Sequence, residues 1–167
     1  MLEFLLLTVF PGIMAFAGAM DLLTLTIPNR ISLALIVLFF VLAPLAGLGA
    51  ADIAMHVISG FSVLVISIGL FSLGWFGGGD AKLLSAVALW VGFEQLLPYL
   101  LYVALAGGAV VVLFLQFRSM PLPRFALAQP WAVRLHGRDG GIPYGLALAA
   151  GALVVYPQTS WFTALLG

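Results

Sequence analysis

The chain has 167 residues, of which 64% are hydrophobic and 7% charged, and its formal net charge is zero. Because soluble domains carry about 25% charged residues, this composition excludes a soluble globular domain and indicates an integral membrane protein of one compact domain. The neutral balance gives no indication of nucleic-acid binding, and the lack of cysteine excludes disulfides, thiol nucleophiles and cysteine-ligated zinc or iron–sulfur sites.

Six apolar stretches follow one another along the chain. A membrane-spanning helix needs about 17–25 mostly apolar residues, and we predict helices over residues 2–20, 31–50, 56–76, 83–98, 99–117 and 143–162. The fourth is the weakest, because only residues 83–93 are continuously apolar and Pro98 alone marks its boundary with the fifth. No basic residue precedes the first stretch, which predicts a retained helix rather than a cleaved signal peptide. The predicted fold is all-α, with residues 1–167 forming a single polytopic membrane domain.

The basic residues predict the orientation of these helices. Arg30 follows the first helix, Lys82 follows the third, and four arginines follow the fifth, within residues 118–138. Three acidic residues fall on the opposite side: Glu3, Asp52 and Glu94. The positive-inside rule then places the first, third and fifth loops in the cytoplasm and makes both termini non-cytoplasmic. Asp21 and Asp80 consequently stand on the cytoplasmic side, at similar depth.

The longest loop, residues 118–142, is rich in proline and arginine. Two interpretations of it remain open. Its arginines and aromatic residues suit an interfacial segment that lies on an anionic leaflet. Alternatively, the loop is a flap that contacts the substrate.

Tryptophan and small-residue patterns predict depth and packing. Tryptophan concentrates at membrane interfaces, so we predict interfacial positions for Trp75, Trp90, Trp131 and Trp161. The alanine and glycine residues within 104–109 favour close contact between helices.

Asp21 is the first of two aspartates at the ends of apolar stretches. An ionisable side chain beside lipid is energetically costly, so such residues usually face a polar cavity and serve a function. Ile27, Pro28 and Asn29 come six to eight residues later. There the alternative is purely structural, because Pro28 and Asn29 are suited to turning the chain and capping the next helix.

Asp80 is the second aspartate, and it follows Gly77, Gly78 and Gly79. Three glycines weaken a helix and permit an unwound backbone, which at membrane depth persists only beside protein or a water-filled cavity. They also let an extended substrate approach the backbone closely, as a protease requires. The alternative is an ordinary turn in which Asp80 pairs with Lys82.

Together these segments resemble the prepilin peptidase family of membrane aspartyl proteases, which belong to the GxGD proteases. The resemblance covers nearly the whole chain, in matching order. It rests on Asp21 with Ile27-Pro28-Asn29, on Gly77-Gly78-Gly79-Asp80-Ala81-Lys82-Leu83 and on Ile142-Pro143-Tyr144-Gly145.

The resemblance implies a role for each matching residue. Asp21 and Asp80 match the catalytic aspartates. The supporting positions are the glycines Gly77 and Gly79 of GxGD with Gly78 between them, the basic residue Lys82, the pair Pro28 and Asn29, and Pro143, Tyr144 and Gly145, which open the last helix in a structural role.

The family also implies the chemistry. Two close carboxylates cannot both ionise easily, so they share a proton. One takes a proton from the attacking water while the other donates to the scissile carbonyl oxygen, with no metal or organic cofactor. The sequence does not distinguish acid from base between Asp21 and Asp80. Lys82 either biases the ionisation of the pair or binds lipid headgroups.

Substrate and location follow from the same resemblance. It implies cleavage of the short basic leader of prepilins and pseudopilins at the cytoplasmic face of the bacterial inner membrane. The expected partners are these substrates and the lipid bilayer, with the pilus assembly machinery as a further candidate and no nucleic acid. Larger members carry an N-terminal insertion with paired CxxC motifs and methylate the product. Because this chain has no cysteine, we expect no methyltransferase or zinc insertion, as in short members associated with tight-adherence (Flp) pili, so that methylation is absent or falls to another protein.

Other functions fit less well. Presenilin-type GxGD proteases place a tyrosine before the first aspartate, where this chain has Met20. No His-Glu-x-x-His is present for zinc proteolysis, and the His56–Ser59 pair lacks the Gly-x-Ser-Gly of a rhomboid-like site. A small proton- or cation-coupled transporter, or a scaffold subunit of a pilus or secretion machine, is the alternative, because paired intramembrane carboxylates also suit ion passage.

Overall fold

The computed structural model describes residues 2–137 and 141–162, and every regular element within them is helical. The long helices are α1 (Leu2–Thr24), α2 (Asn29–Leu45), α3 (Ala50–Ser72), α4 (Gly78–Ser119) and α7 (Tyr144–Val155). The short elements include α5 (Arg124–Leu127), α6 (Pro130–His136) and the 3-10 turn η1 (Tyr156–Gln158). The all-α prediction is therefore confirmed.

The helix α4 is a hairpin of two antiparallel arms. Gly92, with φ 68° and ψ 177°, interrupts it, a conformation that glycine adopts without a steric penalty. The first arm (residues 78–91) packs against α3, while the second arm (residues 93–119) runs back toward the start of α7, where Gly107 meets the Tyr144 side chain. The predicted boundary at Pro98 is thus wrong, because Pro98 lies inside the second arm. Proline tolerates a helical φ and removes one backbone donor, whereas Gly92 reverses the chain.

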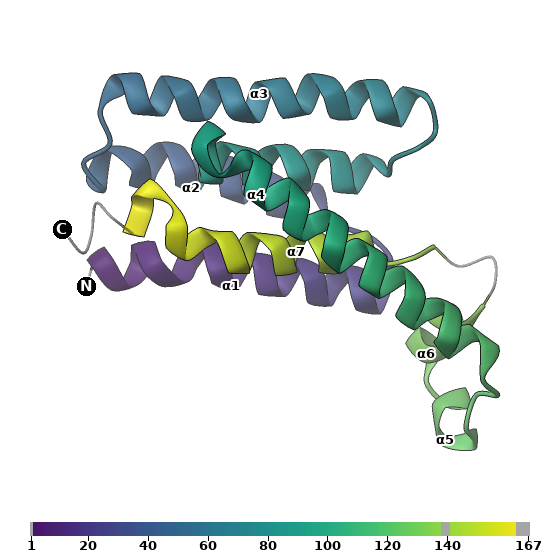
Figure 1. Ribbon diagram of the computed structural model, residues 1–167. Coiled ribbons are helices and arrows are strands. Elements are labelled where there is room, and N and C mark those ends of the chain that lie inside the picture. The colour runs from purple at the N-terminus through teal and green to yellow at the C-terminus, as the bar shows by residue number, and fades with distance from the viewer. Residues whose placement is uncertain (1, 138–140, 163–167) are drawn as a thin grey trace.

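The two arms of α4 organise the bundle. The first arm packs on α3 and α2, and α7 packs on α4 and on α1. Figure 1 shows α7 lying along α1, with α5 and α6 beyond one end of the bundle and the start of α1 at the other. We call the end where α1 stops and α2, α4 and α7 begin the site end of the bundle.

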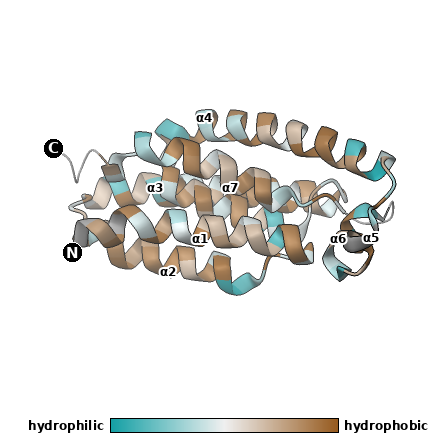
Figure 2. Cartoon of the chain, turned by 90° about the horizontal axis from the view of Figure 1, so that it is seen from below, coloured by the Kyte–Doolittle hydropathy of each residue, from teal (hydrophilic) through white to brown (hydrophobic). Residues whose placement is uncertain are grey.

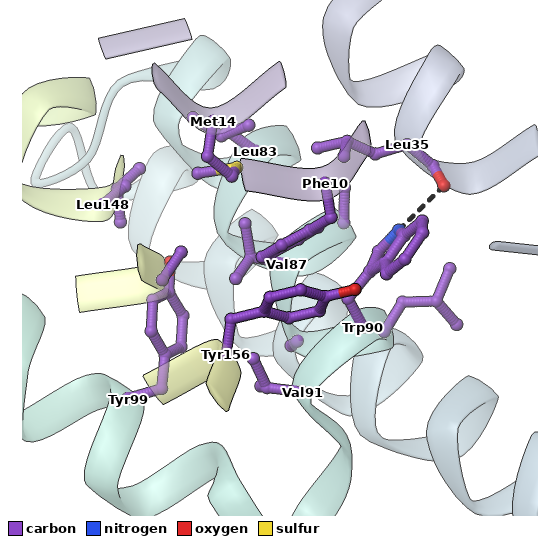
Figure 3. Close-up of a cluster of buried hydrophobic side chains, with 14 of the residues drawn as sticks. Phe10, Met14, Leu35, Leu83, Val87, Trp90, Val91, Tyr99, Leu148 and Tyr156 are labelled. Carbon is purple, nitrogen blue, oxygen red and sulfur yellow. Dashed lines mark hydrogen bonds between the residues drawn. The ribbon is translucent and has the colours of Figure 1, made fainter. Parts of the chain in front are cut away.

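The core lies between α1, α2, α7 and the first arm of α4. Phe10 stacks on Trp90 with ring centroids 4.9 Å apart and contacts Tyr156 at 4.6 Å. Met14 and Val87 close the same cluster and are fully buried. Figure 3 shows these side chains converging from α1, from the first arm of α4 and from η1. Close packing of this kind holds apolar helices together where exclusion of water contributes little.

Two of the four tryptophans do not lie where the sequence predicts them. Trp90 and Trp161 are fully buried and stack with ring centroids 4.6 Å apart. Their indole N–H groups donate to the carbonyl oxygens of Leu35 and Trp90, respectively, at 2.9 and 2.8 Å. Satisfied donors allow an indole to be buried, so the interfacial interpretation is wrong for this pair. Trp75 and Trp131 are exposed.

Three of the described helices are long and apolar enough to cross a membrane, namely α1, α3 and α4, and α2 and the α7–η1 segment are shorter apolar helices. Figure 2 shows hydrophobic residues along all of them, with hydrophilic residues gathered toward helix ends and the α5–α6 region. Division of α4 at Gly92 gives six apolar helical segments in the described chain. The number of spans that these segments make and the side of the termini stay predictions.

The long loop carries α5 and α6 and is anchored to its neighbours by arginines. Arg118 donates from Nε to the carbonyl oxygen of Leu135 at 2.9 Å. Arg134 donates to the carbonyl oxygens of Leu23 and Thr24 at 3.3 and 3.4 Å, which are among the carbonyls that a helix C-terminus leaves without intrahelical partners. The segment therefore docks on the site end, and both of its interpretations stay open.

Candidate active site

Asp21 lies in the last turn of α1, with only 5% of its surface exposed. Its Oδ2 accepts a hydrogen bond of 2.6 Å from the backbone N–H of Gly145, 124 residues away. The helix ends three residues later, and Leu25 adopts a left-handed conformation with φ 54°. A non-glycine residue rarely adopts this conformation. Because α1 ends at Thr24 and Leu25 is left-handed, the chain turns away from the helix axis directly after Asp21.

Gly145 is held against Asp21 by α7, in whose first turn it lies. A Cβ at this position would lie 2.8 Å from Oδ2 and 2.9 Å from Cβ of Asp21, and 2.8 Å from Cδ1 of Ile27. Only glycine fits there. The first N–H groups of a helix have no intrahelical acceptor and carry the positive end of its dipole, so α7 presents a donor to the carboxylate.

Asp80 lies in the first turn of α4, whose N-cap is Gly77. Its carboxylate folds back over that residue, because a Cβ on Gly77 would lie 2.7 Å from Oδ2 of Asp80. The predicted unwound glycine run is only partly correct, since Gly78 and Gly79 are already helical and only Gly77 is extended. Helical geometry after Gly77 fixes where the Asp80 side chain leaves the backbone.

Both aspartates line one cavity of about 320 Å³ at the site end. The remaining lining comes from the turn after α1 and from the three glycines: Leu25, Thr26, Ile27, Gly77, Gly78 and Gly79. Asp80 interacts electrostatically with Asp21. Two carboxylates facing one cavity, bordered by glycine backbone, can hold a water molecule and accept an extended peptide close to the main chain.

Ile27, in the turn between α1 and α2, contacts both α4 and α7. It is not among the site residues predicted from the sequence. A Cβ on Gly79 would lie 3.4 Å from Cβ of Ile27, and the Ile27 Cδ1 lies against Gly145. The α1–α2 turn is thereby wedged between α4 and α7. The sequence feature that indicates Ile27 is its place in the Ile27-Pro28-Asn29 segment. In that segment, Pro28 and Asn29 were interpreted as turn and cap residues, and Ile27 was given no role.

Lys82, Pro28 and Asn29 lie beside the site rather than in it. Lys82 is exposed and its Nζ donates to Oδ1 of Asn29 at 2.9 Å, so the pairing of Lys82 with Asp80 is wrong. Pro28 is the N-cap of α2 and makes no side-chain cap bond. Asn29 begins the helix, and its side chain links the starts of α2 and α4 rather than capping.

Pro143 and Tyr144 position the start of α7. Pro143 is buried and is the N-cap of the helix. The Tyr144 ring packs edge-on against Phe76, with centroids 6.4 Å apart. Its hydroxyl lies over Gly107, where a Cβ would be only 2.6 Å away. Close approach at Gly107, within the small-residue run, sets the spacing of α4 and α7 and hence where Gly145 meets Asp21.

His56 lies near the beginning of α3, away from the two aspartates. Its Nδ1 is 2.7 Å from the carbonyl oxygen of Leu89, and its ring lies under Gly92. The buried Ser59 hydroxyl has no partner in the described residues, so these two residues do not form a hydrogen-bonded Ser–His pair there. In the same residues, no group of three or more His, Asp or Glu side chains is placed to hold a metal ion.

Comparison with known families agrees with this geometry. A model described as the type IV leader peptidase family matches residues 8–112. The match covers more than half of the chain and includes both Asp21 and Asp80. The chain therefore belongs to the type IV leader peptidase family, and the resemblance to prepilin peptidases is confirmed. No curated protein and no solved structure matches the chain significantly. Gly145 lies outside the matched residues and is linked to the site by its hydrogen bond to Asp21.

Proposed function

We propose that this family member is an aspartyl endopeptidase of the bacterial inner membrane. It cleaves the short basic leader from Flp-type prepilins and pseudopilins, at the cytoplasmic face, in a single membrane-embedded peptidase domain. The observation that carries the proposal is the shared cavity of Asp21 and Asp80. The grouping of Arg30 and Lys82 at the same end as this cavity supports a cytoplasmic site through the positive-inside rule.

The proposed reaction uses both carboxylates on one water molecule. Because Oδ2 of Asp21 is occupied by the Gly145 N–H donor, we place the shared proton on Asp80 and make Asp21 the base. Asp21 removes a proton from the water as its oxygen bonds to the scissile carbonyl carbon, and Asp80 protonates the carbonyl oxygen. The tetrahedral intermediate collapses when the C–N bond breaks. The leaving nitrogen takes the proton held by Asp21, and Asp80 recovers its own.

The glycines give the substrate room beside these groups. A helical substrate hides its scissile amide, so the segment around the cut must extend. Gly77, Gly78 and Gly79 line the cavity without side chains of their own, which suits the close approach of an extended segment to the backbone. The apolar helix that follows the cut stays beside the protein in the bilayer.

The test is cleavage of a co-expressed Flp-type prepilin in membranes. The parent is compared with Asp21→Asn, Asp80→Asn and, as a matched control, Glu94→Gln, which neutralises an exposed carboxylate that lines a different cavity. We expect the parent and the control to cut after the leader glycine, and each aspartate variant to insert stably and lose at least about 10²-fold in rate. Near-parent cleavage by either aspartate variant would make that residue structural, and the transporter or scaffold function would then be favoured.

A further inference from the structure

A cavity larger than that of the candidate active site opens on the outside of the bundle. It has a volume of about 630 Å³ and lies between α2, α3 and the first arm of α4. It exists because α2 packs on α4 rather than on α3. We call it the α2–α3 groove. Its walls are mainly apolar side chains that face outward: Leu33, Ile36, Phe40 and Phe61 are 38–64% exposed.

Two positive charges stand at the mouth of the α2–α3 groove. Arg30 lies in the first turn of α2 and Lys82 at the start of the second turn of α4, and both are exposed. Within the described residues, Arg30 makes no ion pair, and Lys82 donates only to the neutral amide of Asn29. Among those residues, no carboxylate lines the groove. The mouth thus offers two cations to an anionic group, and the adjoining walls offer an apolar channel.

The length of the groove indicates the kind of molecule that it accepts. From Arg30 to Phe40 it follows ten residues of α2, or about 15 Å at 1.5 Å per residue. That is half of the roughly 30 Å hydrocarbon thickness of a bilayer, and therefore the depth of one leaflet. A helix that crosses the bilayer needs twice this length. The basic leader of a prepilin would also be repelled by the cations at the mouth.

We propose that the α2–α3 groove binds an anionic phospholipid, with its headgroup between Arg30 and Lys82 and one acyl chain along the apolar walls. The bound lipid joins the beginnings of α2 and α4. The turn that carries Ile27 leads directly into α2, and the first turn of α4 carries Asp80. The lipid is a structural ligand that holds these helix starts together, and its binding does not depend on the proposed peptidase activity.

The experiment measures lipid binding to the delipidated full chain by native mass spectrometry. The probes are phosphatidylglycerol and the zwitterionic phosphatidylcholine, which share a phosphate and differ in net charge. The variants are Arg30→Gln with Lys82→Gln, and the groove-filling Ile36→Trp. Ile66→Trp is the matched control, because Ile66 is exposed on α3 but does not line the groove.

We expect phosphatidylglycerol to bind the parent and the Ile66→Trp control more tightly than phosphatidylcholine does. Each basic residue contributes about 1 kcal/mol to anionic lipid binding, so the double variant is expected to bind it about thirtyfold more weakly. Ile36→Trp should also lose binding, which tests the groove if the double variant fails to fold. Equal binding of the two lipids, unchanged binding by folded Ile36→Trp, or displacement of the lipid by a prepilin transmembrane peptide would overturn the proposal, the last in favour of a substrate helix.

Discussion

Replacing Gly145 with alanine tests the contact that connects α7 to Asp21. The added Cβ would lie 2.8 Å from Oδ2 of Asp21 and 2.8 Å from Cδ1 of Ile27, so both side chains or the start of α7 must move. Overpacking of this kind costs about 1–3 kcal/mol of stability. A displacement of about 1 Å at a catalytic group costs about 10²-fold in rate. We therefore expect kcat for leader removal to fall about 10²-fold while KM changes little.

The assay combines initial rates on a purified prepilin with thermal unfolding of the same preparations. The matched control is Gly69→Ala, because a Cβ there meets nothing within 4 Å. A second variant adds Ile27→Val to Gly145→Ala, which removes the Cδ1 clash but leaves the clash with Asp21. It should recover part of the lost stability and little of the lost rate. A Gly145→Ala protein with the parent's rate and unfolding temperature would refute the steric reasoning.

Three further substitutions test the site and its support. Gly77→Ala places a Cβ 2.7 Å from Oδ2 of Asp80, so we expect about a 10²-fold lower cleavage rate with correct membrane insertion. Gly107→Ala places a Cβ 2.6 Å from the Tyr144 hydroxyl, and should lower the free energy of unfolding by about 1–3 kcal/mol, measured by denaturation in detergent. Trp90→Ala removes a fully buried ring that stacks on Phe10 and Trp161. It should lower the free energy of unfolding by about 3–5 kcal/mol in the same measurement.

The two glycine substitutions each have a neighbouring glycine for comparison. Gly78→Ala meets only the Phe71 ring, at 3.3 Å, and Gly108→Ala meets nothing within 4 Å. Gly108→Ala should behave nearly as the parent does, whereas Gly78→Ala, which also lines the site cavity, should slow cleavage less than Gly77→Ala does. If Gly78→Ala slows cleavage as much as Gly77→Ala, flexibility of the glycine segment matters more than the space for Asp80. If Gly108→Ala and Gly107→Ala lower stability equally, helix propensity rather than the Tyr144 contact explains the loss.

Much of the site was predictable because polar residues are conspicuous in so apolar a chain. The cost of an ionisable group in lipid drew attention to Asp21 and Asp80, and both do line one cavity. The glycines before Asp80 were predicted to give a substrate access. Gly77 has a more specific reason, since the carboxylate of Asp80 occupies the space of its missing Cβ, a contact that only three-dimensional geometry reveals.

The wrong predictions have a common physical cause. Tertiary contacts decide between structures that the local sequence permits equally well. Pro98 and Gly92 are both helix-breaking residues, and the tertiary structure selects Gly92, where the His56 ring occupies the space that a Cβ would need. Tryptophan suits an interface or a core equally. Trp90 and Trp161 enter the core because backbone carbonyls accept their N–H groups there.

The sequence by itself determined that this protein is a helical, apolar chain with two aspartates at helix ends and the motifs of a leader peptidase, because composition and short motifs are local properties. The tertiary structure decided which groups meet. It brings Gly145 to Asp21 across 124 residues and links Lys82 to Asn29 instead of Asp80. It also leaves α2 apart from α3, so that a groove opens between them. These outcomes depend on how the helices pack together, which no single segment of the chain encodes.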